Sequence, residues 1–119
     1  MEYFYLQVPV LDPTTIEDLY TEVRSYYGMD STVTPSGDPN DEAGFCLFAA
    51  AVCDYVESIF ELLTGYQVEA IVSVGDNVFV TLITDRGSFC LVLDYYYEIT
   101  DNNFWQITQA FWEMYLEHG

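Results

Sequence analysis

The first helix is predicted from apolar residues that recur every three or four positions between Asp12 and Gly28. Two starts fit the sequence: Asp12 can cap a helix whose first residue is Pro13, or Thr14 can open a capping box that Glu17 completes. Gly28 is the predicted end of this helix. The apolar stripe consists of Ile16, Leu19, Tyr20, Val23, Tyr26 and Tyr27.

A second, central helix is predicted from Phe45 to Thr64, with Asn40 or Asp41 as its cap and Gly65 at its end. Its first half is apolar on every side, which indicates that the fold surrounds it. Its second half is amphipathic, because three carboxylates recur at i, i+3 and i+7 and therefore fall in one line. These carboxylates are Asp54, Glu57 and Glu61.

Strands are predicted where apolar and polar residues alternate or where β-branched residues form short runs. Three such runs follow the central helix, and the turn-forming residues 75–77 and 85–87 between them favour consecutive hairpins. An alternating run that Pro9 closes predicts an edge strand near the N-terminus. The predicted strands are Tyr3 to Val10, Gln67 to Val74, Val78 to Thr84 and Ser88 to Tyr97.

A last helix is predicted from Thr100 or Asp101 to about Glu117, with a wide apolar stripe. The predicted order is β-α-α-β-β-β-α, an antiparallel meander with helices packed on one face, so the fold class is α+β. The 119 residues show no repeat and no linker, and we expect a single domain over residues 1–119. Residues 29–44 are predicted to form a long polar loop.

The chain is strongly acidic. It contains 20 Asp and Glu residues, its two basic residues of the Lys and Arg types are Arg24 and Arg86, and its net charge is −18 at pH 7. Aromatic residues make up 18% of the chain, which indicates a packed body rather than a disordered acidic segment. Nucleic acids and anionic membranes are held by clusters of Lys and Arg, so we expect neither to bind directly. Basic protein partners are favoured instead.

Targeting signals and the number of cysteines indicate the cellular compartment of a protein and the state of its thiols. The N-terminus lacks the basic region of a signal peptide, and no run reaches about 18 uninterrupted apolar residues, so a cytoplasmic protein is expected. The odd number of cysteines, all in apolar runs, predicts free and mostly buried thiols. They are Cys46, Cys53 and Cys90.

Motifs for enzymatic chemistry are missing from the sequence, which shows no glycine-rich phosphate loop, no nucleophile elbow and no histidine cluster. The sole histidine, His118, lies next to the end of the chain. Asp38, Asp41 and Glu42 share one loop, but they lack the spacing of an EF-hand, and a solvated loop is favoured over a calcium site. We therefore expect no enzyme activity, no cofactor and no metal.

Residues 44–94 resemble part of the small papain-like peptidases and amidases, in which a helix that begins with a cysteine precedes a meander of strands. Cys46 would lie near a helix N-terminus, where the helix dipole favours the thiolate. The resemblance implies a histidine near Asn77 and an orienting residue near Asp94. Because that histidine is missing, it implies an inactive relative. The alternative is that Cys46 is a small hydrophobic residue on a buried helix.

The carboxylates are spread singly over helices, turns and strands, where their mutual repulsion destabilises the compact state. The absence of lysine indicates that the negative field is itself useful. In size and charge pattern the whole chain resembles the DNA-mimic inhibitors of phages and mobile elements, the anti-CRISPR and anti-restriction proteins. The resemblance implies a non-enzymatic inhibitor that blocks the basic nucleic-acid-binding cleft of a bacterial defence or DNA-processing protein.

Acids on helices are the first candidates for such a contact, because helices hold side chains at fixed separations. Loop acids and rigid aromatic anchors can join them. Taken singly, each acid is also explained by the polar face that an amphipathic helix presents to water. The candidate partner-binding residues are Glu17, Asp18, Glu22, Asp38, Asp41, Glu42, Asp54, Glu57, Glu61, Tyr95 and Tyr97.

Other interpretations stay open at this point. Salt adaptation also produces acidic surfaces without lysine, although large hydrophobic residues usually become rarer there. A dedicated interaction module, such as an antitoxin or immunity protein for one basic partner, differs from a DNA mimic mainly in its target. A homodimer is compatible with either function.

Overall fold

The computed structural model describes residues 13–93 and 103–118, and within these ranges the order of elements is α-α-β-β-β-α. The α+β class is therefore confirmed, while the predicted strand Tyr3 to Val10 lies outside the described residues. The elements are α1 (Pro13–Tyr27), α2 (Glu42–Thr64), β1 (Glu69–Val74), β2 (Val78–Thr84), β3 (Gly87–Leu93) and α3 (Asn103–Glu117).

The three strands form one antiparallel meander in the order β1-β2-β3, as predicted. Thr84 pairs with Gly87 across a two-residue turn, and Gly87 has a φ of 123°, a conformation that favours glycine. The strand β1 begins at Glu69, two residues later than predicted. The described part of β3 ends at Leu93, and the rest of the predicted strand lies outside the described residues.

The helix ends follow local capping chemistry. α1 begins at Pro13, which agrees with the interpretation that places proline at the first helical position. α2 begins at Glu42, three residues earlier than predicted, because the Asp41 carboxylate accepts a hydrogen bond from the Gly44 N–H at 3.3 Å. It ends at Gly65, which is left-handed with a φ of 77° and donates its N–H to the Glu61 carbonyl oxygen.

The loop between α1 and α2 is held by hydrogen bonds to its main chain. Arg24 Nε donates to the Val33 carbonyl oxygen at 2.9 Å, and the Ser36 N–H donates to the Gly44 carbonyl oxygen at 3.0 Å. A Cβ atom at Gly44 would lie 2.5 Å from the Thr34 carbonyl oxygen, so only glycine lets the loop approach α2 this closely.

Phe104 of α3 joins the three helices. Its buried ring lies edge-on against Tyr20 of α1 and against Phe48 and Tyr55 of α2, with centroid distances of 5.8, 6.2 and 5.8 Å. A second aromatic group forms where Phe60 meets Trp112 and Tyr115 of α3 at 5.6 Å each. The aromatic residues that the sequence supplies therefore form the contacts between the helices.

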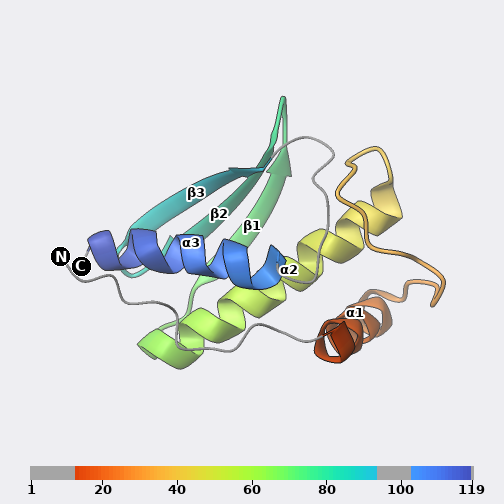
Figure 1. Cartoon of the computed structure of the whole chain (residues 1–119), viewed down its shortest axis with the longest axis horizontal. Helices are drawn as coiled ribbons and strands as arrows, with labels where there is room; N and C mark the ends of the chain where they lie inside the picture. Colours follow the sequence, from red (N-terminus) through yellow and green to blue (C-terminus); the bar gives the residue numbers. More distant parts are fainter. Residues whose placement is uncertain (1–12, 94–102, 119) are drawn as a thin grey trace.

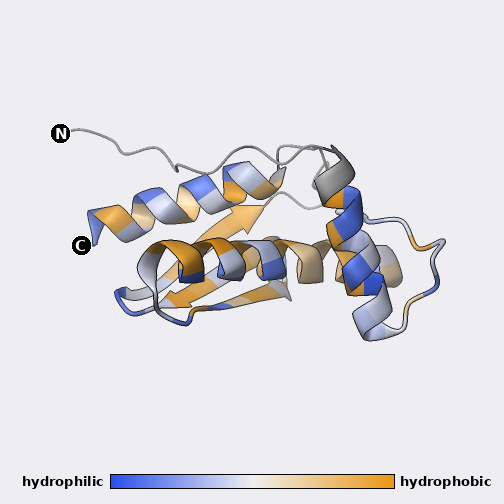
Figure 2. Cartoon of the chain, turned by 90° about the horizontal axis from the view of Figure 1, so that it is seen from below, coloured by the Kyte–Doolittle hydropathy of each residue, from blue (hydrophilic) through white to orange (hydrophobic). Residues whose placement is uncertain are grey.

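The helices cover one face of the sheet. Val80, Leu82 and Phe89 are buried on that face, against α2, which runs beside β1, and α3, which crosses the strands (Figure 1). α1 packs on α2 at a distance from the sheet, and the strands are hydrophobic along most of their length (Figure 2). The residues that alternate with the buried ones lie on a face that no described helix covers.

In length and composition α2 could also cross a membrane, and it is the one helix of the described residues that could. Half of its most apolar stretch is buried inside the fold, where Leu47, Ala51 and Val56 contribute to the core. Burial in the domain thus accounts for the apolar residues in that half of the stretch. The first half of α2 is not surrounded on every side as predicted, since Cys46 is exposed and Ala50 is half-buried.

The prediction that the thiols are mostly buried is wrong. Cys46 and Cys90 are exposed and Cys53 is half-buried, and all three are free. Cys46 lies on the outer side of α2, and Cys90 points to the uncovered face of the sheet. Burial raises the pKa of the Cys53 thiol to about 12, with a further contribution from the carboxylates of Glu57 and Asp54.

Candidate partner-binding surface

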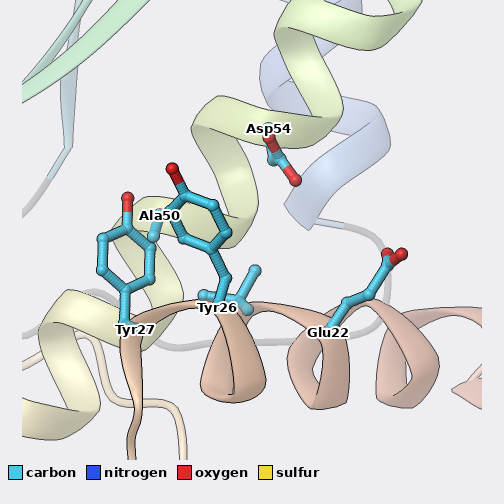
Figure 3. Close-up of a pocket in the computed structure, with 6 residues that line it drawn as sticks. Glu22, Tyr26, Tyr27, Ala50 and Asp54 are labelled. Atoms are coloured by element: carbon cyan, nitrogen blue, oxygen red, sulfur yellow. The ribbon is translucent and has the colours of Figure 1, made fainter.

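A groove between α1 and α2 brings together acids from both helices. It has a volume of about 420 Å³ and is lined by Glu22, Val23, Tyr26, Tyr27, Ala50 and Asp54. Figure 3 shows Glu22, Tyr26 and Tyr27 rising from α1 on the side of α2, while Asp54 reaches from α2 toward them. Two acids that the sequence placed on separate candidate helices thus line one groove, which we call the tyrosine groove.

Tyr26 and Tyr27 supply the aromatic surface of this groove. They are 84% and 60% exposed, and their rings meet edge-on at 5.0 Å. Helical spacing placed both tyrosines in the apolar stripe of α1, but neither is buried there. Adjacent residues on a helix diverge by about 100°, so two neighbouring tyrosines cannot both face a narrow stripe, and this signal could have identified them.

The three predicted carboxylates of α2 lie on the side of the helix that faces β1, and we call them, together with Glu69 of β1, the acidic ridge. Glu57 is half-buried, and its carboxylate accepts a hydrogen bond from the Ala70 N–H. Burial raises the pKa of Glu57; the hydrogen bond from Ala70 opposes this shift, and the charges of Asp54, Glu61 and Glu69 reinforce it. The ridge meets the tyrosine groove at Asp54, so the two form one surface.

The remaining predicted residues are placed differently. Glu17 and Asp18 are exposed on α1 but do not line the groove. Asp38 accepts a hydrogen bond from the Asn40 N–H at 2.9 Å, and Asp41 caps α2, so both stabilise their own loop, while Glu42 is exposed in the first turn of α2. Tyr95 and Tyr97 lie outside the described residues.

The side chains of both arginines donate hydrogen bonds to main-chain carbonyl groups of the same chain. Arg24 donates to the Val33 carbonyl oxygen, and Arg86 Nη1 donates to the Tyr115 carbonyl oxygen at 2.9 Å. The Arg86 guanidinium also lies 4.1 Å from the centre of the Tyr115 ring. Neither cation lines the tyrosine groove, so its carboxylates stay available to an external cation.

The papain-like arrangement that was considered for Cys46 would need an imidazole beside the thiol. His118 follows α3, where its ring lies 5.0 Å from that of Phe89 and its Nδ1 lies 2.9 Å from the Met114 carbonyl oxygen. The start of α2 and the end of α3 lie at opposite ends of the molecule (Figure 1), so His118 cannot act as a base for Cys46. Among the described residues no group of three or more His, Cys, Asp or Glu could hold a metal ion.

The environment of Glu57 predicts a pH-dependent effect. Glu57→Gln preserves an oxygen that can accept from Ala70 and removes a charge that burial and three neighbouring carboxylates disfavour. Because the pKa of Glu57 is raised in the folded state, the stability that it contributes is present below its ordinary pKa of 4.5 and is lost as the pH rises through the raised value.

The variant is therefore expected to be more stable than the natural chain at pH 7, by less than about 1 kcal/mol because water screens a half-exposed charge. The two proteins should unfold alike near pH 4. Chemical denaturation at both pH values measures this difference, with Glu117→Gln on α3 as the exposed control. A lower stability of Glu57→Gln at pH 7 would contradict the assignment.

Comparisons with known proteins give no relative from which a role could be transferred. The chain matches no protein-family model, no curated protein and no solved structure. Function is therefore inferred from the chemistry of the chain's own surface.

Proposed function

We propose that the chain is a non-enzymatic acidic inhibitor that mimics nucleic acid and occupies the basic nucleic-acid-binding cleft of a bacterial defence or DNA-processing protein, in the manner of anti-CRISPR and anti-restriction proteins. The observation that carries the proposal is the continuous surface formed by the acidic ridge and the tyrosine groove, with carboxylates from α1, α2 and β1. The net charge of −18 gives this surface a long-range attraction for basic proteins.

The spacing of the ridge supports mimicry. Along a helix the rise per residue separates Asp54 from Glu57 by about 4.5 Å and Glu57 from Glu61 by about 6 Å. Each strand of duplex DNA carries one charge per about 3.4 Å of axis, which is a separation of the same order. A cleft shaped for a row of phosphates can therefore meet a row of carboxylates held by α2.

The tyrosine groove adds aromatic rings to the carboxylates of the surface. The carboxylates of Glu22 and Asp54 can accept hydrogen bonds from a guanidinium or ammonium group, and the exposed rings of Tyr26 and Tyr27 offer faces to the same cation. Basic nucleic-acid-binding clefts present Arg and Lys side chains, so the groove suits the end of one of these.

The test is a column of the immobilised chain that is loaded with bacterial lysate at low salt and eluted with a salt gradient. We expect a nucleic-acid-binding protein to be retained, to be displaced by duplex DNA, and to bind more weakly as the salt concentration rises. A retained protein that duplex DNA does not displace would contradict mimicry and would favour a dedicated interaction module.

A further inference from the structure

The face of the sheet that the described helices leave uncovered carries five apolar residues among nine. The strand register brings nine alternate residues of the three strands to this side, which we call the open face. Ile71, Ile83 and Val92 are 42%, 40% and 59% exposed there, beside the half-buried Phe79. The nine residues are Glu69, Ile71, Ser73, Phe79, Thr81, Ile83, Ser88, Cys90 and Val92.

The open face is also nearly free of charge. Of its nine residues only Glu69 belongs to the acidic or basic residue types Asp, Glu, Lys and Arg, and it lies at the start of β1, at the border of the face. The chain has 20 acidic residues, and every described helix carries some of them. The face is therefore an almost uncharged area, with apolar side chains among Ser and Thr, within a strongly negative surface.

We propose that the open face binds the open face of a second copy of this chain, so that two sheets pack face to face in a reversible homodimer. The proposal does not depend on the proposed function, because the open face shares only Glu69 with the acidic ridge. The tyrosine groove and the carboxylates of α2 stay outside the dimer contact.

Charge favours a second copy over a basic protein as the partner of the open face. A basic protein is attracted to the carboxylates of α1 and α2 rather than to a face with one acid at its border. Two molecules of net charge −18 repel each other in most orientations, and the open face lets them touch without pairing carboxylates across the centre of the contact. Two twisted sheets can also pack face to face, so this face can match its own copy around a two-fold axis.

The edge of β1 is a poor alternative for self-association. An exposed strand edge recruits other strands through its free N–H groups, yet the Ala70 N–H donates to the Glu57 carboxylate. The ridge carboxylates beside this edge would also repel the same edge of another copy. Sheet-on-sheet packing therefore fits the structure better than strand addition at β1.

The size of the open face sets the strength of the dimer. A strand spacing of about 4.8 Å and a rise of about 3.4 Å per residue give it a footprint of roughly 15 by 20 Å. A stable complex usually buries about 800 Å² per partner, so the dimer is expected to be weak and to depend on concentration.

Sedimentation equilibrium over a range of concentrations tests the proposal. The dimer should become at least about tenfold tighter between 0.1 and 1 M NaCl, since the Debye length falls from about 10 to about 3 Å and the repulsion is screened. Val92→Lys should weaken the dimer at least about tenfold, because burying the new charges has a large desolvation penalty. Leu62→Lys on α2, where the side chain is 75% exposed, is the matched control and should dimerise like the natural chain.

The natural cysteines provide a second measurement. Cys90 pairs with Thr81 on the central strand, so two Cys90 thiols in the dimer lie within roughly 15 Å of each other, given a sheet separation of about 10 Å. A bis-maleimide linker of that length should give a covalent dimer that Cys90→Ser abolishes and Cys46→Ser preserves.

A chain that stays monomeric at about 1 mM in 1 M NaCl would overturn the proposal, as would crosslinking that requires Cys46. If Val92→Lys weakened capture of the basic partner and left the oligomeric state unchanged, the open face would belong to that partner. The salt responses separate the two proposals, because salt strengthens the dimer and weakens binding to a basic cleft.

Discussion

Phe104→Ala is expected to lower the free energy of unfolding by about 3–5 kcal/mol, the range found when a buried phenylalanine is truncated. The ring is fully buried and contacts Tyr20, Phe48 and Tyr55 at once, so its loss leaves a cavity where the three helices meet. A domain of this size is stable by about 5–15 kcal/mol, so the variant would lose a large share of its stability.

Chemical denaturation followed by circular dichroism measures this effect. Tyr26→Ala is the matched control, since it also removes an aromatic ring but from a side chain that is 84% exposed, and it should change stability by less than about 0.5 kcal/mol. A loss below about 1 kcal/mol for Phe104→Ala would show that the contacts between the helices do not depend on this ring.

The triple variant D54K/E57Q/E61K is expected to reduce affinity for the basic protein captured on the column at least about 100-fold. It reverses the charges of the exposed Asp54 and Glu61 and removes the charge of Glu57. The loss of one partner of a close charge pair typically costs about 2–5 kcal/mol. Glu57 is changed to glutamine because lysine could not accept the hydrogen bond from Ala70. Titration calorimetry at fixed salt measures the loss.

The control for this variant is E113K/E117K/D76N, whose three sites are exposed on α3 and in the β1–β2 turn. Both variants change the net charge of −18 by the same amount, because each contains two changes to lysine and one to an amide. The control should bind within about threefold of the natural chain, since only long-range attraction is reduced. Equal losses in the two variants would mean that net charge, and not the ridge, determines binding.

Periodicity was sufficient to predict most elements of the fold. Gly28 and Gly65 end their helices because a left-handed residue closes the last turn, and that signal is local. The meander followed from runs of β-branched residues separated by residues that favour tight turns. The start of α2 was misplaced, because the reach of the Asp41 side chain to Gly44 determines it and hydrophobic pattern does not.

The candidate site was predicted less completely. Helical spacing correctly placed Asp54, Glu57 and Glu61 on one side of α2, since i, i+3 and i+7 positions share a face in any helix. The sequence did not indicate that Glu22 faces Asp54, because the angle at which α1 crosses α2 depends on packing. The exposure of Tyr26 depends on the same crossing.

The sequence by itself determined the charge, the α+β class and the line of carboxylates on α2, because composition and short-range periodicity act without the rest of the fold. Tertiary structure alone decided that acids of α1 and α2 share a groove, that the Glu57 carboxylate meets the Ala70 N–H of β1, and that no described helix covers one face of the sheet. The physical reason is that burial depends on which elements meet. Tyr20 and Tyr26 belong to one helix and one predicted stripe, yet only Tyr20 meets α3.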